Sequence, residues 1–181
     1  MHVEDSQLIN QPVHNVFNYV ADPRTLPQWS GPTVEVRDIQ QNAPGALGEG
    51  DEFTAVHKFL GQRLEEHSEV TAYEPNRHVR YWSTGGPMPT EINFIFEEVP
   101  GAGTRLTMSM DNQPEGFFKL IGPVFRRAVK RTVRNDLQTL KDVLEAQAER
   151  GEESTSESHP TEGNREYFRK LIEKTKERSG L

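Results

Sequence analysis

The stretch FFKLIGPVFRRAVKRTVRNDLQTLKDVLEAQA, residues 117–148, decides the fold because it carries the longest unbroken helical period in the chain. Its apolar residues recur at steps of three and four, which places them on one face of a helix. At 1.5 Å per residue such a helix would reach roughly 45 Å. An apolar stripe of that length needs a partner of similar length, and the preceding residues read mostly as strands. The sequence therefore predicts an α+β domain in which a long C-terminal helix packs on a sheet.

The region before this helix predicts the sheet. From residue 51 to 113 apolar and polar residues alternate at period two, which is typical of antiparallel strands joined by hairpins. Nearer the N-terminus the predicted elements are a strand over 3–10, a helix that starts at Pro12 and ends at the Asp22-Pro23 step, a short helix over Thr25–Trp29 and a strand over 34–39. The helix ends there because the residue before a proline is pushed out of the α region.

The hairpin registers follow from keeping apolar residues opposite each other on one face. The predicted pairs are Phe59 with Leu64, His57 with Glu66 and Ala55 with Ser68; Ala72 with Val79, Val70 with Tyr81 and Ser68 with Ser83; and Ile92 with Met110, Phe94 with Met108 and Phe96 with Leu106. Because side chains on a strand alternate between faces, all of these residues are expected to point toward the helix.

Composition narrows the classes of partner. The 181 residues carry a formal net charge of -7, which opposes broad attraction to nucleic acid or anionic lipid. The chain has no cysteine and its six histidines show no metal-ligand spacing, so no disulfide and no metal site are expected. Nucleotide-binding and acyl-enzyme motifs are absent, and no cofactor is expected. The N-terminus lacks a signal pattern and no run of about 18 apolar residues occurs, so we expect a cytoplasmic protein without membrane insertion.

The chain is expected to form one domain with a tail. Residues 1–148 contain the predicted strands and the long helix. Residues 149–163 contain no large apolar side chain, which predicts an acidic flexible linker. Residues 164–181, NREYFRKLIEKTKERSGL, regain a helical pattern and predict a short amphipathic helix. That helix either frays in solution or docks on the domain or on a protein partner.

Four stretches recur in the order of a known family. They are INQPVHNVFNYVADPRTLPQWSGPTVEV at 9–36, VTAYEPNR at 70–77, GTRLT at 103–107 and NDLQTLKDVLE at 135–145. Together they resemble the polyketide cyclase/dehydrase and lipid-transport family (SRPBCC), the bacterial branch of the START-like or Bet v 1-like superfamily. The resemblance covers about residues 3–146 and leaves the tail unexplained.

This resemblance implies a helix-grip fold, in which a seven-stranded antiparallel sheet grips the C-terminal helix. It also implies a cavity between sheet and helix that holds a hydrophobic or amphipathic small molecule. Members of the family include cyclases and hydratases but also lipid carriers, so the resemblance alone does not imply catalysis.

His57, Glu66 and Tyr81 are the candidate catalytic residues. A carboxylate beside an imidazole in a pocket of low dielectric can set the tautomer of the imidazole and raise its basicity, which suits general acid/base chemistry. The Tyr81 hydroxyl could donate a hydrogen bond to a ligand oxygen. The alternative is that His57 and Glu66 lie near the hairpin tip, beyond the core, and are simply solvated.

A second set is expected to line a ligand pocket. It consists of Trp29, Ser68, Ser83, Phe94, Phe96, Met108, Met110, Phe117, Phe118 and Phe125. Methionines would let the shape of the pocket adapt to a ligand. The alternative is that the same residues fill a solid core.

Basic residues gather on the opposite face of the long helix. They are Arg126, Arg127, Lys130, Arg131 and Arg134. This pattern is typical of the solvated face of an amphipathic helix, with the phosphates of lipid or RNA as the alternative partner.

Three hypotheses for function remain. The first is binding or transport of a hydrophobic small molecule, such as a lipid, polyketide, isoprenoid or quinone. The second is a cyclase or dehydratase that acts on a polyketide-like substrate through His57, Glu66 and Tyr81. The third is an interaction module whose terminal helix binds a protein partner.

Overall fold

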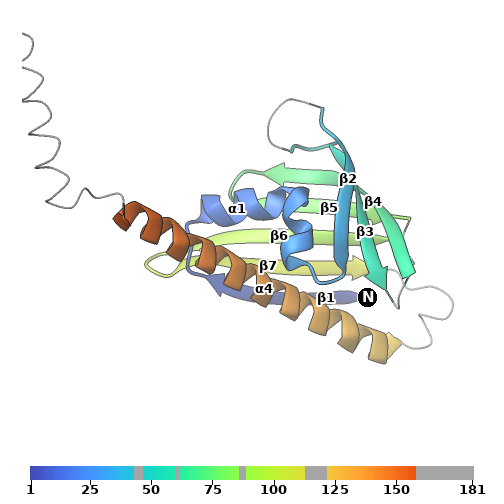
Figure 1. The fold of residues 1–181 in the computed structure, drawn as a ribbon. Coiled ribbons are helices and arrows are strands. Elements are labelled where there is room, and N and C mark those ends of the chain that lie inside the picture. Colours follow the sequence, from blue (N-terminus) through green and yellow to red (C-terminus); the bar gives the residue numbers. More distant parts are fainter. Residues whose placement is uncertain (43–46, 60–61, 86–88, 113–121, 158–181) are drawn as a thin grey trace, which may run out of the picture. The chain divides into compact units, whose positions relative to one another are not determined.

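The computed structural model describes residues 1–42, 47–59, 62–85, 89–112 and 122–157. The chain divides into two compact units, Met1–Glu145 and Ala146–Leu181. In order, the elements are β1 (His2–Ile9), α1 (Val13–Ala21), the 3-10 helix η1 (Pro23–Thr25), α2 (Leu26–Trp29), β2 (Thr33–Gln40), β3 (Glu52–Phe59), β4 (Gln62–Glu74), β5 (His78–Thr84), β6 (Thr90–Val99), β7 (Gly103–Asn112) and α4 (Gly122–Glu157) (Figure 1).

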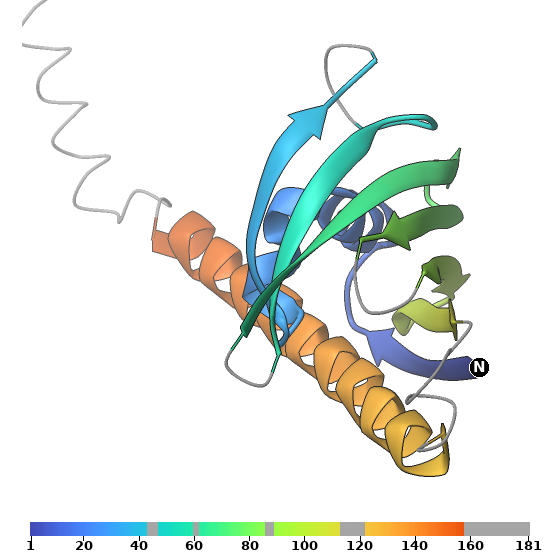
Figure 2. The same cartoon turned by 90° about the vertical axis from the view of Figure 1, so that its right-hand side faces the viewer.

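The first unit is built on one antiparallel sheet in the order β1-β7-β6-β5-β4-β3-β2. The sheet twists and curves, and α1 and α2 lie inside the curve (Figure 2). The predicted seven-stranded antiparallel sheet with a long C-terminal helix is confirmed.

The core lies where the apolar stripe of α4 meets α1 and the inner face of the sheet. Val133, Leu137 and Leu140 of α4 are each at most 1% exposed and belong to the same buried cluster as Phe17 of α1. The Phe17 ring meets the Phe96 ring of β6 edge-on, with the centroids 5.1 Å apart. The predicted apolar stripe is therefore buried at these positions, whereas Val124, also expected on it, is 70% exposed near the start of the helix.

The register of two hairpins, β4–β5 and β6–β7, follows the prediction with one exception, at Ala72 of β4. In β6–β7 the pairs Ile92–Met110, Phe94–Met108 and Phe96–Leu106 are confirmed, and in β4–β5 the pairs Val70–Tyr81 and Ser68–Ser83 are confirmed. Ala72 was expected opposite Val79 but lies opposite Arg80, because a register shift separates it from Val70. Such a bulge inserts one residue, which brings Tyr73 into line with Val79 instead.

The predicted register of β3–β4 is wrong by two residues. The observed pairs are Phe59 with Gln62, His57 with Leu64, Ala55 with Glu66 and Phe53 with Ser68. A slip of two keeps every side chain on its original face, because the side-chain period of a strand is two. The hydrophobic pattern therefore cannot distinguish the two registers, and the predicted inward set is preserved.

Helix α4 continues to Glu157 and overlaps the beginning of the predicted linker at 149–163. Pro123 stands in its first turn, where a missing N–H costs little. Residues 113–121 and 158–181 lie outside the described residues. The linker and the terminal helix at 164–181 stay predictions.

Candidate functional site

A cavity of about 320 Å³ lies between the inner face of the sheet, α2 and α4. Of the residues predicted to line a pocket, Trp29, Ser68, Ser83, Phe94, Met108, Met110 and Phe125 line it. Phe96 does not belong to its lining and packs on Phe17 in the core. Phe117 and Phe118 lie outside the described residues.

Aromatic rings form one wall of the cavity in edge-to-face contacts. Trp29 and Phe94 have centroids 6.1 Å apart, Tyr81 and Phe94 are 6.0 Å apart, and Phe53 and Tyr81 are 5.4 Å apart. The indole Nε1 of Trp29 donates to the Thr25 hydroxyl at 3.2 Å, which fixes the ring at the end of α2. Interlocked rings of this kind make a wall of defined shape.

His57 and Glu66 meet in the cavity, although they are not opposite each other in the sheet. The distance from His57 Nε2 to Glu66 Oε2 is 3.3 Å, and the two side chains are 21% and 20% exposed. The pair is therefore diagonal across β3 and β4 and is partly shielded from solvent.

A chain of hydrogen bonds continues from His57 to α4. Thr33 Oγ1 lies 3.1 Å from His57 Nδ1 and donates to Ser30 Oγ at 3.1 Å. Ser30 Oγ in turn donates to Asp136 Oδ2 at 3.4 Å. We call Glu66, His57, Thr33, Ser30 and Asp136 the polar chain, and all five line the cavity.

Counting hydrogens assigns the donors in the polar chain. The Thr33 hydroxyl has one hydrogen and gives it to Ser30, so His57 Nδ1 donates to Thr33. An attractive contact between His57 Nε2 and Glu66 then needs one further proton between them. The pair holds it either as an imidazolium beside a carboxylate or as a neutral imidazole beside a carboxylic acid. This arrangement can store and transfer a proton at the cavity wall.

Asp136 was missed by the sequence analysis. It is 5% exposed, and the backbone N–H of Gly31 donates to its Oδ1 at 3.0 Å. Burial raises the pKa of Asp136 to about 6, against the smaller opposing effects of the hydrogen bonds from Gly31 and Ser30 and of the charge of His57. The sequence contained a signal, since Asp136 falls at helical spacing from Val133 and Leu140 on the buried stripe.

A second set of polar side chains crosses the sheet in one row. Ser68, Ser83, Thr90 and Asn112 are paired in succession from β4 to β7, and all four are buried and line the cavity. The two serine hydroxyls are 2.6 Å apart, and Asn112 Nδ2 donates to Thr90 Oγ1 at 2.9 Å. In the part of the chain that the structure describes, Asn112 Oδ1 has no hydrogen-bond donor. The sequence analysis found the serines and missed Thr90 and Asn112.

Tyr81 lines the cavity, but its hydroxyl is engaged elsewhere. The hydroxyl donates to the carbonyl of Ala21, at the end of α1, at 3.5 Å. Burial, followed by the neighbouring Tyr73 and Asp22, raises the pKa of Tyr81 far above its ordinary value. The phenol therefore stays protonated and holds α1 to the sheet.

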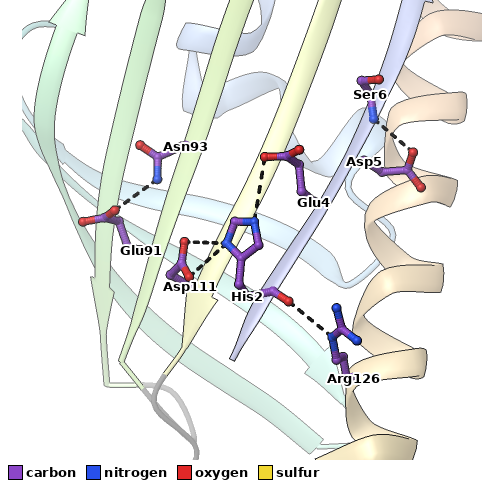
Figure 3. Close-up of polar contacts among 8 residues, drawn as sticks. All are labelled: His2, Glu4, Asp5, Ser6, Glu91, Asn93, Asp111 and Arg126. Atoms are coloured by element: carbon purple, nitrogen blue, oxygen red, sulfur yellow. Dashed lines mark hydrogen bonds and ion pairs between the residues drawn. The ribbon is translucent and has the colours of Figure 1, made fainter.

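The outer face of the sheet carries a separate group of polar contacts (Figure 3). His2 Nδ1 lies 3.0 Å from both carboxylate oxygens of Asp111, and His2 Nε2 lies 3.8 Å from Glu4. These side chains are about half exposed, so solvent screens their interaction. Among the described residues, no group of three or more His, Cys, Asp or Glu is arranged to hold a metal ion.

The basic face of α4 is exposed, as expected for a solvated face. Two of its members contact β1. Arg134 Nε donates to Asp5 Oδ2 at 3.0 Å. Figure 3 shows the other contact, in which Arg126 Nε donates to the His2 carbonyl at 3.4 Å. Within the described residues, no helix is long and apolar enough to cross a membrane.

Comparisons with known proteins give one family. The family model for "Polyketide cyclase / dehydrase and lipid transport" matches residues 1–145. No curated protein matches the chain.

Solved structures share the fold at low sequence identity. A START superfamily protein from Mycobacterium smegmatis aligns with a TM-score of 0.69 and 15% identity over 80% of this chain and 97% of its own. A Staphylococcus aureus protein of unknown function aligns with a TM-score of 0.65 and 15% identity over 82% of this chain and 96% of its own. A Thermus thermophilus protein aligns with a TM-score of 0.62 and 20% identity over 81% of this chain and 98% of its own.

Proposed function

The chain belongs to the polyketide cyclase/dehydrase and lipid transport family, and from this premise we propose that it binds a hydrophobic small molecule, such as a lipid, polyketide, isoprenoid or quinone, between the sheet and α4. The observation that carries the proposal is the cavity of about 320 Å³. This volume falls at the lower end of the roughly 300–1,000 Å³ range of small-molecule pockets. The aromatic wall and the two methionines of β7 offer a ligand a mainly apolar surface.

The test is native mass spectrometry of the protein purified from its own cells, followed by mild denaturation to release any bound molecule. The proposal expects a lipid-like or polyketide-like mass. Ala128→Trp is the variant expected to weaken binding, because Ala128 lines the cavity from α4 and a large ring there would narrow the cavity. Gln138→Trp is the control, since Gln138 is exposed on the same helix outside the cavity lining.

The result that contradicts binding is equally clear. Wild-type protein that releases nothing, and whose thermal stability does not respond to added apolar molecules, would point to a closed core. Equal release from wild type and Ala128→Trp would place the bound molecule outside this cavity.

Proton-transfer catalysis is the second candidate, and the His57–Glu66 contact at 3.3 Å is the observation that favours it. A partly shielded imidazole and carboxylate could move a proton to or from a carbon beside a carbonyl, the step that cyclases and dehydratases need. The polar chain adds Asp136 to this group. Tyr81 is a weaker member, because its only hydroxyl hydrogen is donated to Ala21.

Turnover of the released molecule separates the two candidates. For an enzyme, His57→Ala should lower turnover by about 10²–10⁴-fold while binding is largely retained. A carrier should show no turnover, and the same change should leave its binding of the molecule nearly unchanged. His2→Ala on the exposed outer face is the control for the loss of a histidine.

A further inference from the structure

We propose that the cavity selects its ligand by the polar end: it takes an apolar molecule that ends in a hydrogen-bond donor, best a protonated amine, and excludes a carboxylate. This inference rests on the proposed function, because it names the ligand class for the same cavity. It goes further by specifying the charge and the hydrogen-bonding sense of the ligand.

The first support is the charge of the lining. Within the described residues, the cavity is lined by two carboxyl groups, Glu66 and Asp136, and one imidazole, His57, and by no lysine or arginine. The basic side chains of α4 are exposed on another face of the helix, and Arg126 and Arg134 contact β1. A carboxylate ligand would therefore enter a site that offers no guanidinium or ammonium partner. His57, the one imidazole of this lining, already contacts Glu66 at 3.3 Å, so burying a further anion without a cationic partner of its own is strongly unfavourable.

The second support is the state of Asp136. Its two carboxyl oxygens accept hydrogen bonds from Gly31 N and Ser30 Oγ, whereas a carboxylate offers about four lone-pair positions. Asp136 can therefore accept further hydrogen bonds, although only 5% of this residue is exposed to solvent. Burial makes the ionised form of Asp136 unfavourable, so a positively charged ligand group beside the carboxylate would stabilise that form.

The third support is that several of the remaining polar atoms can accept a hydrogen bond but cannot donate one. Glu66 accepts only, apart from the proton it shares with His57. Asn112 Oδ1, at the buried end of β7 in the lining, has no donor among the described residues. The oxygens of Glu66, Asp136 and Asn112 therefore leave acceptor capacity in this cavity. A ligand that brings donors satisfies it, and a ligand that brings acceptors does not.

The experiment compares three probes with the same apolar body and different polar ends: octylamine, octanol and octanoate. Binding is followed by the fluorescence of Trp29, which lines the cavity. Trp82 is the second of two tryptophans, is 37% exposed and lies outside the cavity lining, so Trp82→Phe leaves Trp29 as the reporter. The full chain is used at mildly alkaline pH, where the amine is still protonated and Asp136 is ionised.

The proposal expects octylamine to bind about tenfold or more tightly than octanol, because a charge-assisted hydrogen bond is stronger than a neutral one. Octanoate should bind most weakly. Asp136→Asn should lower the affinity for octylamine by about tenfold and leave octanol nearly unchanged. This variant keeps an oxygen that can accept from Gly31. Asp111→Asn, an exposed carboxyl on the outer face, should change nothing (Figure 3).

Two failures are distinguishable. Equal or tighter binding of octanol or octanoate, or an unchanged amine affinity in Asp136→Asn, overturns the proposed selection while the binding function stands. If none of the three probes changes the Trp29 fluorescence or the melting temperature, the binding function fails and the selection fails with it.

Discussion

Asp136 lies on the buried stripe of α4, where its helical neighbours Val133, Leu137 and Leu140 are apolar and buried. A carboxyl group in such a position lowers stability unless its oxygens are paired. The N–H of Gly31 and the Ser30 hydroxyl, both between α2 and β2, supply two hydrogen bonds. Asp136 thereby connects α4 to the segment that carries Trp29 and presents an acid to the cavity.

The buried acid makes stability depend on pH. Folding raises the pKa of Asp136 from roughly 3.9 in an unfolded chain to about 6, so the folded state binds this proton more tightly. The resulting stabilisation is complete below about pH 4 and is lost as the pH rises through about 6, by about 2–3 kcal/mol. Asp136→Asn carries no such proton. We expect the free energy of unfolding of wild type, relative to the variant, to fall by that amount across this window.

Urea unfolding of both proteins at several pH values measures this difference. The comparison with the variant cancels the other carboxylates, which titrate in both chains. A constant difference from pH 4 to 7 would mean that Asp136 is not desolvated in the folded protein. Asp5→Asn on β1, paired with Arg134, serves as the control carboxyl.

Gly103 shows how a single position limits the chain at the start of β7. Its φ is +107°, and a Cβ built there would lie 2.2 Å from the carbonyl oxygen of Ile9. Gly103→Ala therefore combines a strained backbone with a clash against β1, and we expect the free energy of unfolding to fall by about 2–3 kcal/mol. Gly101→Ala is the matched control, since Gly101 also has positive φ (+73°) but no atom within 4 Å. In thermal melting, the Gly101→Ala variant should have a clearly higher melting temperature than the Gly103→Ala variant. An equal loss in the two variants would mean that the clash is relieved by backbone movement.

At the scale of elements, α4 and the sheet depend on each other. The stripe of α4 is at most 1% exposed at Val133, Leu137 and Leu140, whereas Val124 on the same helix is 70% exposed. The turn after α2 and the start of β2 connect the two layers, because they place Ser30 and Thr33 between His57 and Asp136. The cavity is thus bounded by the sheet, α2 and α4.

Replacing single side chains of α4 by alanine should reveal this packing. Leu140→Ala removes buried methyl groups and leaves a void, so we expect a loss of about 2–5 kcal/mol in the free energy of unfolding. Val124→Ala on the same helix should change it by less than about 0.5 kcal/mol, because the side chain is exposed. Denaturant unfolding monitored by circular dichroism measures both. Similar losses at the two positions would contradict the observed packing of the helix.

At the scale of the whole molecule, the first unit contains the sheet, the core and the cavity. All residues of the core cluster and of the cavity lining lie before residue 146. The family match ends at residue 145 as well. The unit therefore has what an independent fold needs.

A chain that stops at residue 148 should fold and bind as the full chain does. We expect its melting temperature to lie within about 2 °C of the full-length value, because no core residue is removed. A shift larger than that, or a loss of probe binding, would show that the tail stabilises the domain. Differential scanning calorimetry of both chains decides this, and the same pair of chains tests the predicted docking of residues 164–181.

The sequence by itself determined the order of the elements and the face to which most side chains point, with Ala72 after the bulge in β4 and Val124 of α4 as exceptions. The helical period of residues 117–148 and the alternation of residues 51–113 are local patterns that burial imposes on every chain of this architecture. For this reason the alternation of residues 51–113 predicts Ser68, Ser83 and Phe94 on the cavity side, where they lie. The wrong β3–β4 register did not disturb this result, since a slip of two preserves the face.

Tertiary structure decided which side chains meet. His57 reaches Glu66 diagonally, and Asp136 pairs with Gly31 and Ser30 across 105 and 106 positions of sequence. Whether Phe96 lines the cavity or fills the core likewise depends on where α1 lies above the sheet. Periodicity states whether a residue is buried, but not which buried neighbour it contacts. The ionisation of Asp136 and the bonding of Tyr81 depend on those contacts, and so does the chemistry of the cavity.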